Sequence, residues 1–284
     1  MKLGIHAFAW CTQGSNNTLH LIDKCSQYGV DFIEIPLLDL DVFDAVAVKN
    51  RLEQVGLDAV TSTVLSSSTD ISSLNENIRK CGIKYLKECV RQTSLINATS
   101  FSGVIYSEFA KKDQSPPSAD NWKYVSEALD KVATYGDRYG VTVGLEPVNR
   151  YETNLLNTCD QALDMIKTIG NDNIKIHLDT YHMNIEEKSF YEATKAAGKD
   201  LIHYHLCEND RGIPGTGTVD WDGIFKALKE IDYKGYAGLE NFVGLAQSMN
   251  TWAWVWRQLA PSGDILLKEG TDFVRKMQKK YGLV

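Results

Sequence analysis

The sequence lacks paired cysteines, long apolar runs and an excess of positive charge. None of its six cysteines forms a CxxC pair, so we expect reduced, mostly buried thiols rather than a disulfide framework. No apolar run reaches about 18 residues, and the first ten residues do not resemble a signal peptide. The formal net charge of −7 argues against a nucleic-acid or membrane partner. We therefore expect a cytoplasmic protein that acts on a small molecule.

Eight short apolar segments alternate with longer amphipathic ones, several of which end in glycine as helices commonly do. This alternation predicts parallel βα units, and eight units in a chain of 284 residues predict a single (β/α)8 TIM barrel over residues 1–284. No repeat, linker or low-complexity stretch divides the chain. A doubly wound open sheet is the structural alternative. The expected strands are 3–10, 31–37, 57–64, 98–106, 141–148, 174–179, 201–206 and 236–242.

Four of the later strand segments end in a residue that can bind a metal. Glu146 closes VTVGLEP and Asp179 closes IKIHLD. His205 lies in LIHYHL, and Glu240 closes YAGLE. A single acid in such a place is usually a helix cap, but in a parallel barrel four strand ends converge on one mouth. Three carboxylates and an imidazole there predict a site for one divalent cation, Mn²⁺, Co²⁺ or Mg²⁺, rather than a thiolate zinc site.

Polar residues follow these positions on the same loops. Glu152 lies in GLEPVNRYE, His182 in HLDTYHMN and Arg211 in HYHLCENDRGIPGTG. They could hydrogen-bond the hydroxyl and carbonyl oxygens of a small polar ligand, although loop polarity alone would also account for them. Glu208 could orient Arg211. The glycines of RGIPGTG do not match a phosphate-binding loop.

Glu146 and Glu240 come from the fifth and eighth expected strands, so they could flank a metal-bound substrate. A cation chelated by a ketone oxygen and the adjacent hydroxyl would acidify the carbon that carries that hydroxyl and stabilise an enediolate. One glutamate could then remove the proton while the other returns one to the opposite face. This arrangement predicts epimerisation with two acid/base groups.

The chain resembles the ketose 3-epimerases, which include D-tagatose, D-allulose (psicose) and L-ribulose 3-epimerases within the sugar isomerase/endonuclease IV-like barrels. The resemblance spans the full length and is most specific in GLEPVNRYETNLLNT, HLDTYHMNIEE, HYHLCENDRGIPGTG and GLENF. It implies Mn²⁺ or a similar cation, free ketose substrates, and homodimers or homotetramers. It assigns metal ligation to the four strand-end residues, acid/base roles to the two glutamates among them, and C1–C3 contacts to Glu152, His182 and Arg211.

The resemblance is looser for the far end of the substrate, which the family contacts mainly with apolar side chains. The candidates here are His6, Phe8, Trp10, Ser66 and Tyr106. Near the C-terminus, Trp252, Trp254 and Trp256 alternate and could form an aromatic lid, a subunit interface or packing against the last helix.

Other functions remain open on the residues alone. An aldose–ketose or hydroxypyruvate-type isomerase, or an inosose dehydratase, would use the same barrel with a different substrate register. A DNA-repair endonuclease would need more histidine ligands and a basic face, which six histidines and a net charge of −7 disfavour. A sugar-binding module without catalysis would not require two opposed carboxylates.

Overall fold

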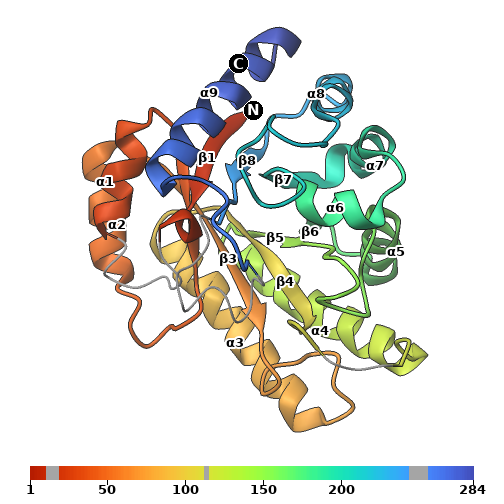
Figure 1. Ribbon diagram of the computed structural model, residues 1–284. Coiled ribbons are helices and arrows are strands. Elements are labelled where there is room, and N and C mark those ends of the chain that lie inside the picture. The colour runs from red at the N-terminus through yellow and green to blue at the C-terminus, as the bar shows by residue number, and fades with distance from the viewer. Residues whose placement is uncertain (11–18, 112–114, 243–254) are drawn as a thin grey trace.

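Eight parallel strands close into a barrel in sequence order, from β1 to β8 and back to β1. The protein is described by a computed structural model that covers residues 1–10, 19–111, 115–242 and 255–284. Figure 1 shows the strands at the centre and the helices around them. The predicted TIM barrel is therefore confirmed. The strands are β1 (Lys2–His6), β2 (Phe32–Pro36), β3 (Asp58–Leu65), β4 (Ser100–Glu108), β5 (Thr142–Leu145), β6 (Ile174–Asp179), β7 (Leu201–Leu206) and β8 (Tyr236–Leu239).

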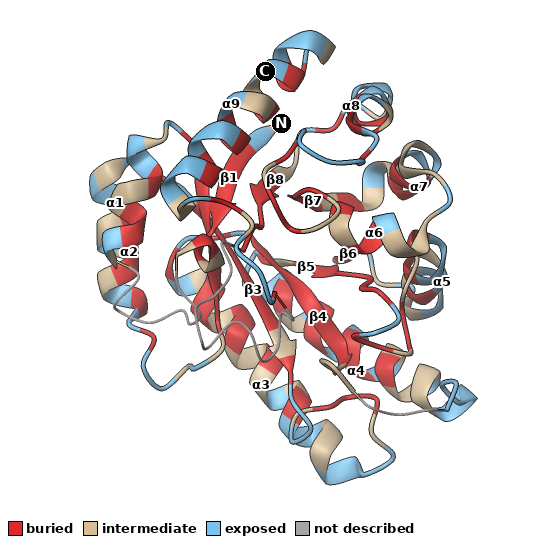
Figure 2. Ribbon diagram, in the orientation of Figure 1, coloured by how far each residue is buried: buried red, intermediate tan, exposed pale blue. Residues whose placement is uncertain are grey.

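The helices cover the outer face of the barrel, and each buries one side against the strands (Figure 2). Met1 and Leu283 lie side by side, since the terminal ammonium donates to the Leu283 carbonyl oxygen at 3.1 Å. The helices are α1 (Leu19–Gln27), α2 (Ala45–Val55), α3 (Glu76–Leu95), α4 (Ala119–Arg138), α5 (Cys159–Ile169), α6 (Thr180–Glu186), α7 (Phe190–Ala197), α8 (Trp221–Glu230) and α9 (Gly263–Tyr281), with short 3₁₀ turns at Ala7–Ala9 and Gly198–Asp200.

Helix ends follow local sequence chemistry. Thr158 caps α5 by accepting from the Gln161 backbone N–H, while the Gln161 side chain binds the Thr158 backbone in return. Asp220 caps α8 in a similar way through the Gly223 N–H. Gly170 ends α5 with a φ of 66°, a left-handed conformation that glycine adopts without steric strain. The two N-caps fix where the loops after β5 and β7, which carry candidate site residues, end.

Several strands are shorter than the apolar segments suggested. β1 ends at His6 and passes into a 3₁₀ turn, because the His6 side chain accepts from the Phe8 N–H and turns the backbone. β5 ends at Leu145 and β8 at Leu239. Glu146 and Glu240 therefore lie one residue beyond their strands, where the backbone begins to leave the sheet.

The barrel interior is filled from its N-terminal end by aromatic and then polar side chains. Phe32 is fully buried, and a Cβ on Gly4 would lie 2.5 Å from its ring. Glycine at that position therefore makes room for the aromatic ring. Above Phe32 lie buried polar residues that the alternation of β2, β6 and β7 directs inward. The interior thus becomes more polar towards the C-terminal ends of the strands.

Among the helices in the described residues, none combines the length and apolar character needed to cross a membrane. Five of the six cysteines lie in the described ranges and are free thiols, and four of these are buried. Both observations agree with the composition.

Candidate metal centre and cavity

The four predicted metal-binding residues converge at the C-terminal mouth of the barrel. Asp179 ends β6 and pairs in register with His205 on β7. Glu146 and Glu240 leave the adjoining strands β5 and β8. One donor atom from each of the four lies within 4.8 Å of every other, and all four side chains are buried.

This donor set fits a divalent cation. The Nδ1 atom of His205 lies 3.4 Å from Glu146 Oε1, 3.3 Å from Glu240 Oε2 and 3.9 Å from Asp179 Oδ2. It is buried and has no hydrogen-bond partner. A buried ring nitrogen without a partner, facing three carboxylates, suits a cation that all four groups could share.

The electrostatics of the four groups are strongly perturbed. Burial raises the pKa of Glu146 to about 8, with Glu240 and Asp179 adding to the rise and His205 opposing it. Burial also opposes ionisation of Glu240, but His205 and Arg211 outweigh it and hold the pKa of that carboxyl well below its ordinary value. The two glutamates thus have pKa values moved in opposite directions, as is common in acid/base pairs.

Arg211 extends from the β7–α8 loop into the carboxylate cluster. Its Nη1 donates to Asp179 Oδ2 at 2.6 Å and to Glu240 Oε2 at 2.5 Å. Its guanidinium carbon lies 4.1 Å from the ring centre of Tyr181 and 5.2 Å from that of Phe242. Arg211 also has a φ of 70°, an uncommon conformation for a residue with a side chain. The loop therefore holds this guanidinium in place at a backbone conformation that carries strain.

A second cluster of polar side chains, formed by Asn149, Glu152 and His182, lies beside Arg211 and its carboxylate partners. Asn149 donates through its amide to Glu152 Oε1 at 2.9 Å, and its backbone N–H donates to His182 Nδ1 at 3.1 Å. His182 Nε2 lies 3.2 Å from Arg211 Nη2. Burial raises the pKa of Glu152 to about 7, although Arg211 and Asn149 oppose the rise. Glu152, His182 and Arg211 are therefore adjacent, as the sequence predicted.

These groups face a cavity of about 260 Å³, a size suited to a small molecule rather than a polymer. One wall is polar and includes Glu146, Glu152, His182, His205, Arg211 and Glu240. The other wall comes from β1 to β4 and the loops that follow them, and it is mainly apolar. The apolar lining includes Phe8, Leu38, Val64, Val104 and Phe109.

Of the residues predicted at the far end of the pocket, only His6 and Phe8 line this cavity among the described residues. Trp10 turns outward, where its indole N–H donates to Asp264 Oδ1 at 3.1 Å. Ser66 lies in an exposed turn with Ser68 and Thr69. The prediction that Trp10 and Ser66 line the pocket is therefore wrong. The chain bends at the ends of β1 and β3, and both side chains lie outside the cavity.

Tyr106 and Glu208 support the site from outside the cavity. Tyr106 is fully buried, and its hydroxyl lies 3.0 Å from the carbonyl oxygen of Glu146. The Glu208 carboxylate accepts from the backbone N–H groups of Gly215 and Val219 and from the indole N–H of Trp221. Glu208 thus fixes the loop that carries Arg211, while the Arg211 guanidinium itself donates to Asp179 and Glu240. Of the aromatic segment near the C-terminus, Trp252 and Trp254 lie outside the described residues, and Trp256 is exposed.

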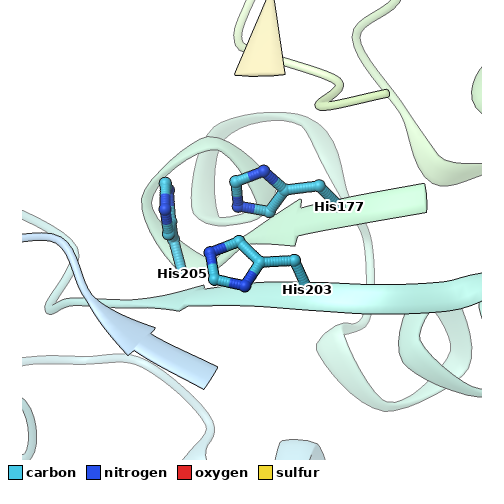
Figure 3. A group of neighbouring side chains, drawn as sticks. All are labelled: His177, His203 and His205. Carbon is cyan, nitrogen blue, oxygen red and sulfur yellow. The ribbon is translucent and has the colours of Figure 1, made fainter. Parts of the chain in front are cut away.

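Sequence reasoning missed a polar layer directly beneath the four candidate metal-binding residues. Glu34 on β2, His177 on β6 and His203 on β7 are each 0% exposed. Figure 3 shows the rings of His177 and His203 next to that of His205. The two-residue period of a strand could have identified His177 and His203, since they lie two residues before Asp179 and His205 and therefore face the same side. Glu34 could have been identified as the one charged residue within the apolar segment FIEIP.

Comparison with known proteins first defines the class. Residues 22–258 match the family of xylose isomerase-like TIM barrels. Three relatives narrow this class. The ketose 3-epimerase of Arthrobacter globiformis is 37% identical over 97% of this chain and 96% of its own. The L-ribulose 3-epimerase of a Methylomonas species is 34% identical over 97% of both chains. A crystal structure of D-allulose 3-epimerase from Methylomonas in complex with D-allulose superposes with a TM-score of 0.93, at 34% identity over 98% of this chain and 97% of that one.

The chain belongs to the ketose 3-epimerase family. The resemblance inferred from its motifs is therefore confirmed over nearly the whole length of the chain.

Proposed function

We propose that this protein catalyses the epimerisation of free ketoses at C3. The proposal depends on one observation above all: two buried glutamates, Glu146 and Glu240, reach the same cavity from different strands beside Asp179 and His205. Relatives that align over nearly the full chain carry the names ketose 3-epimerase and L-ribulose 3-epimerase. Candidate substrate pairs are D-fructose/D-allulose, D-tagatose/D-sorbose and L-ribulose/L-xylulose.

In this proposal Glu146 and Glu240 move the proton. One carboxylate takes the proton from C3, and the electrons of the C3–H bond form a C2–C3 double bond. The carbonyl π electrons pass to the oxygen on C2. The other carboxyl group then returns a proton to the opposite face of C3, and the carbonyl re-forms. Each turnover thus inverts C3 without a net change in atoms or electrons.

Glu146, Asp179, His205 and Glu240 would hold one divalent cation, for which we propose Mn²⁺, with Co²⁺ or Mg²⁺ as alternatives. Such a cation would supply Lewis acidity that makes the C3 proton of a ketose easier to remove.

The remaining cavity residues would orient the sugar. We propose that Glu152, His182 and Arg211 bind the oxygens near C1 to C3, because all three line the polar side of the cavity next to the two glutamates. The far end of the ketose would then face the apolar wall, where Phe8 and Phe109 lie. A wall of this kind excludes water and favours a substrate without a charged terminal group.

We also propose a cytoplasmic location and a homodimeric or homotetrameric assembly, as the resemblance implies. Light scattering on the purified protein measures the assembly directly, and a monomer at all concentrations would contradict it.

The decisive experiment is a substrate panel with metal analysis of the same sample. Metal-loaded protein is incubated with D-fructose, D-tagatose and L-ribulose in deuterated water. We expect the C3 epimer of at least one ketose, with deuterium at C3 of substrate and product. An aldose product without a C3 epimer would refute the proposed reaction, and epimerisation without deuterium uptake would refute the proton-transfer route.

A further inference from the structure

Glu34 lies at the centre of a buried hydrogen-bonded layer beneath the proposed metal site. Its Oε2 is 2.7 Å from His203 Nε2 and 2.8 Å from His205 Nε2. Its Oε1 is 3.5 Å from His6 Nε2. The side chain is 0% exposed and lies on β2, on the far side of the barrel axis from β7. One carboxylate thus contacts three imidazoles, one of which is a proposed metal ligand.

The direction of these hydrogen bonds determines where the protons lie. An ionised carboxylate only accepts, so the Nε2 atoms of His203 and His205 must carry hydrogen. The two short contacts to Glu34 Oε2 place both Nε2 atoms where they can donate to the same carboxylate oxygen. With hydrogen on Nε2, a neutral His205 has its lone pair on Nδ1, the atom that faces Glu146 and Glu240.

We propose that Glu34 is a positioning residue that fixes the ring orientation and tautomer of His205, so that Nδ1 is presented to the metal. Metal-binding histidines commonly donate their second ring N–H to a carboxylate in this way, which increases their basicity and orients the ring. The inference rests on the proposed metal site and adds a residue from the opposite half of the barrel. No motif of the β5–β8 loops includes it.

His6 adds a third ring nitrogen near Glu34. Its Nδ1 accepts from the Phe8 backbone N–H at 3.0 Å, so a neutral His6 carries its hydrogen on Nε2, which lies 3.2 Å from Ser62 Oγ and 3.5 Å from Glu34 Oε1. Among the described residues, Glu34 Oε1 has no hydrogen-bond partner, and both ring N–H donors of the carboxylate bind Oε2. A carboxylate presents only acceptors to these rings, whereas the amide of glutamine would direct an NH₂ group either at the two β7 histidines or at His6.

His177, His203 and His205 could themselves be taken for a second metal site, since their ring nitrogens lie within 4.8 Å of one another. Their rings pack in T-shaped contacts, with centroids 4.0 Å apart for His177 and His205 and 4.3 Å for His177 and His203 (Figure 3). Rings in direct contact leave no space for an ion between them, and neither His177 nor His203 lines the cavity. We therefore expect one metal ion per chain, with the lower histidines as its support.

The first test measures the affinity of the full-length protein for Mn²⁺ alone, by competition with a fluorescent chelator. Glu34→Gln should weaken Mn²⁺ binding by about 10- to 100-fold, the usual effect of losing such a partner. Glu34→Asp keeps a carboxylate and should bind Mn²⁺ with an affinity between the two. Asp70→Asn is the matched control, because Asp70 is also buried but binds Ser72 and Lys111 and contacts none of the ligands.

The second test observes the tautomer. With diamagnetic Mg²⁺ bound, histidine ¹⁵N spectra of the wild-type protein should show His205 with hydrogen on Nε2, the signal being assigned by its loss in His205→Gln. This measurement needs no variant of Glu34, so it decides the question even if Glu34→Gln does not fold.

The outcomes separate the two proposals. Glu34 has no positioning role if the wild-type protein and the Glu34→Gln variant bind Mn²⁺ equally well. The same conclusion follows if Glu34→Gln, like Asp70→Asn, lowers the melting temperature without changing the affinity for Mn²⁺. Hydrogen on Nδ1 of His205 would also overturn the inference, and two Mn²⁺ ions per chain would overturn the supporting role of the lower histidines. If the wild-type protein binds no Mn²⁺, the proposed metal site itself fails, and with it this role for Glu34.

Discussion

Arg211→Ala tests whether the Arg211 guanidinium compensates the negative charge of the buried carboxylates in the metal-free protein. The Arg211 side chain is nearly buried and donates to both Asp179 and Glu240. Its removal leaves these two buried carboxylates without that partner. Breaking a buried ion pair by removing one member destabilises a protein by about 3–5 kcal/mol. In a chain of this size that corresponds to a fall in Tm on the order of 10 °C.

Bound metal should reverse part of this loss. A cation shared by Asp179 and Glu240 replaces the missing positive charge, and it no longer competes with Arg211 for their oxygens. We therefore expect saturating Mn²⁺ to raise the Tm of Arg211→Ala more than that of the wild-type protein. The assay is thermal unfolding of both proteins with EDTA and with Mn²⁺. Equal Tm values in EDTA, or equal increases with Mn²⁺, would refute the reasoning.

Arg211→Gly separates the side chain from the backbone. With a φ of 70° at this position, alanine keeps the steric strain that glycine avoids, and the gain is reduced by the greater freedom of glycine in the unfolded chain. The glycine variant should therefore be more stable than the alanine variant by roughly 0.5–1 kcal/mol. Both variants should lose kcat/KM, since neither retains a guanidinium in the cavity.

Three further predictions concern other groups of the site. Glu240→Gln should abolish C3 deuterium exchange and weaken Mn²⁺ binding, and full activity would remove Glu240 from the proposed mechanism. The Glu152 carboxyl, with its pKa raised to about 7, holds a proton in the folded state that the unfolded chain releases above its ordinary pKa of 4.5. As the pH rises from about 4.5 to 7, the free energy of unfolding should therefore fall, by at most about 3 kcal/mol for this group. Glu152→Gln should reduce the slope of that part of the pH profile in EDTA, where the raised pKa of Glu146 still contributes, and an unchanged slope would contradict the assignment. Glu208→Gln places an amide NH₂ among four N–H donors, so it should lower the free energy of unfolding by about 1–3 kcal/mol and reduce activity through the loop of Arg211. Unaltered unfolding in urea would show that Glu208 does not hold this loop.

Much of the fold could be predicted because each strand is locally marked. Apolar segments that alternate with amphipathic ones indicate βα units, and eight of them close a barrel. The strand ends were less predictable. β1 was expected to reach residue 10, but it ends at His6 because a side chain-to-backbone hydrogen bond turns the chain there. Hydropathy does not register such a bond, so the pocket position expected for Trp10 was wrong, and the turn after β3 likewise places Ser66 outside the cavity.

The candidate site divides in the same way. Glu146, Asp179, His205 and Glu240 follow from the sequence, because strand order and strand ends alone bring them to one mouth. Glu34 does not, since its importance depends on contacts with His203 and His205, which lie 169 and 171 residues further along the chain. A buried charge within an apolar segment shows that a partner must exist, but it does not show which one.

The sequence by itself determined the barrel, the polar residues at its mouth and the family, because these depend on local pattern and on short motifs. Only the tertiary structure decided which residues face the cavity, how Arg211 joins two carboxylates, and which carboxylate contacts His205 Nε2. The physical reason is that closing the barrel brings the inward side chains of β2 and β7 together across its interior. Proton positions and charge balance depend on distances of a few ångströms between such strands, and the linear order of residues does not contain them.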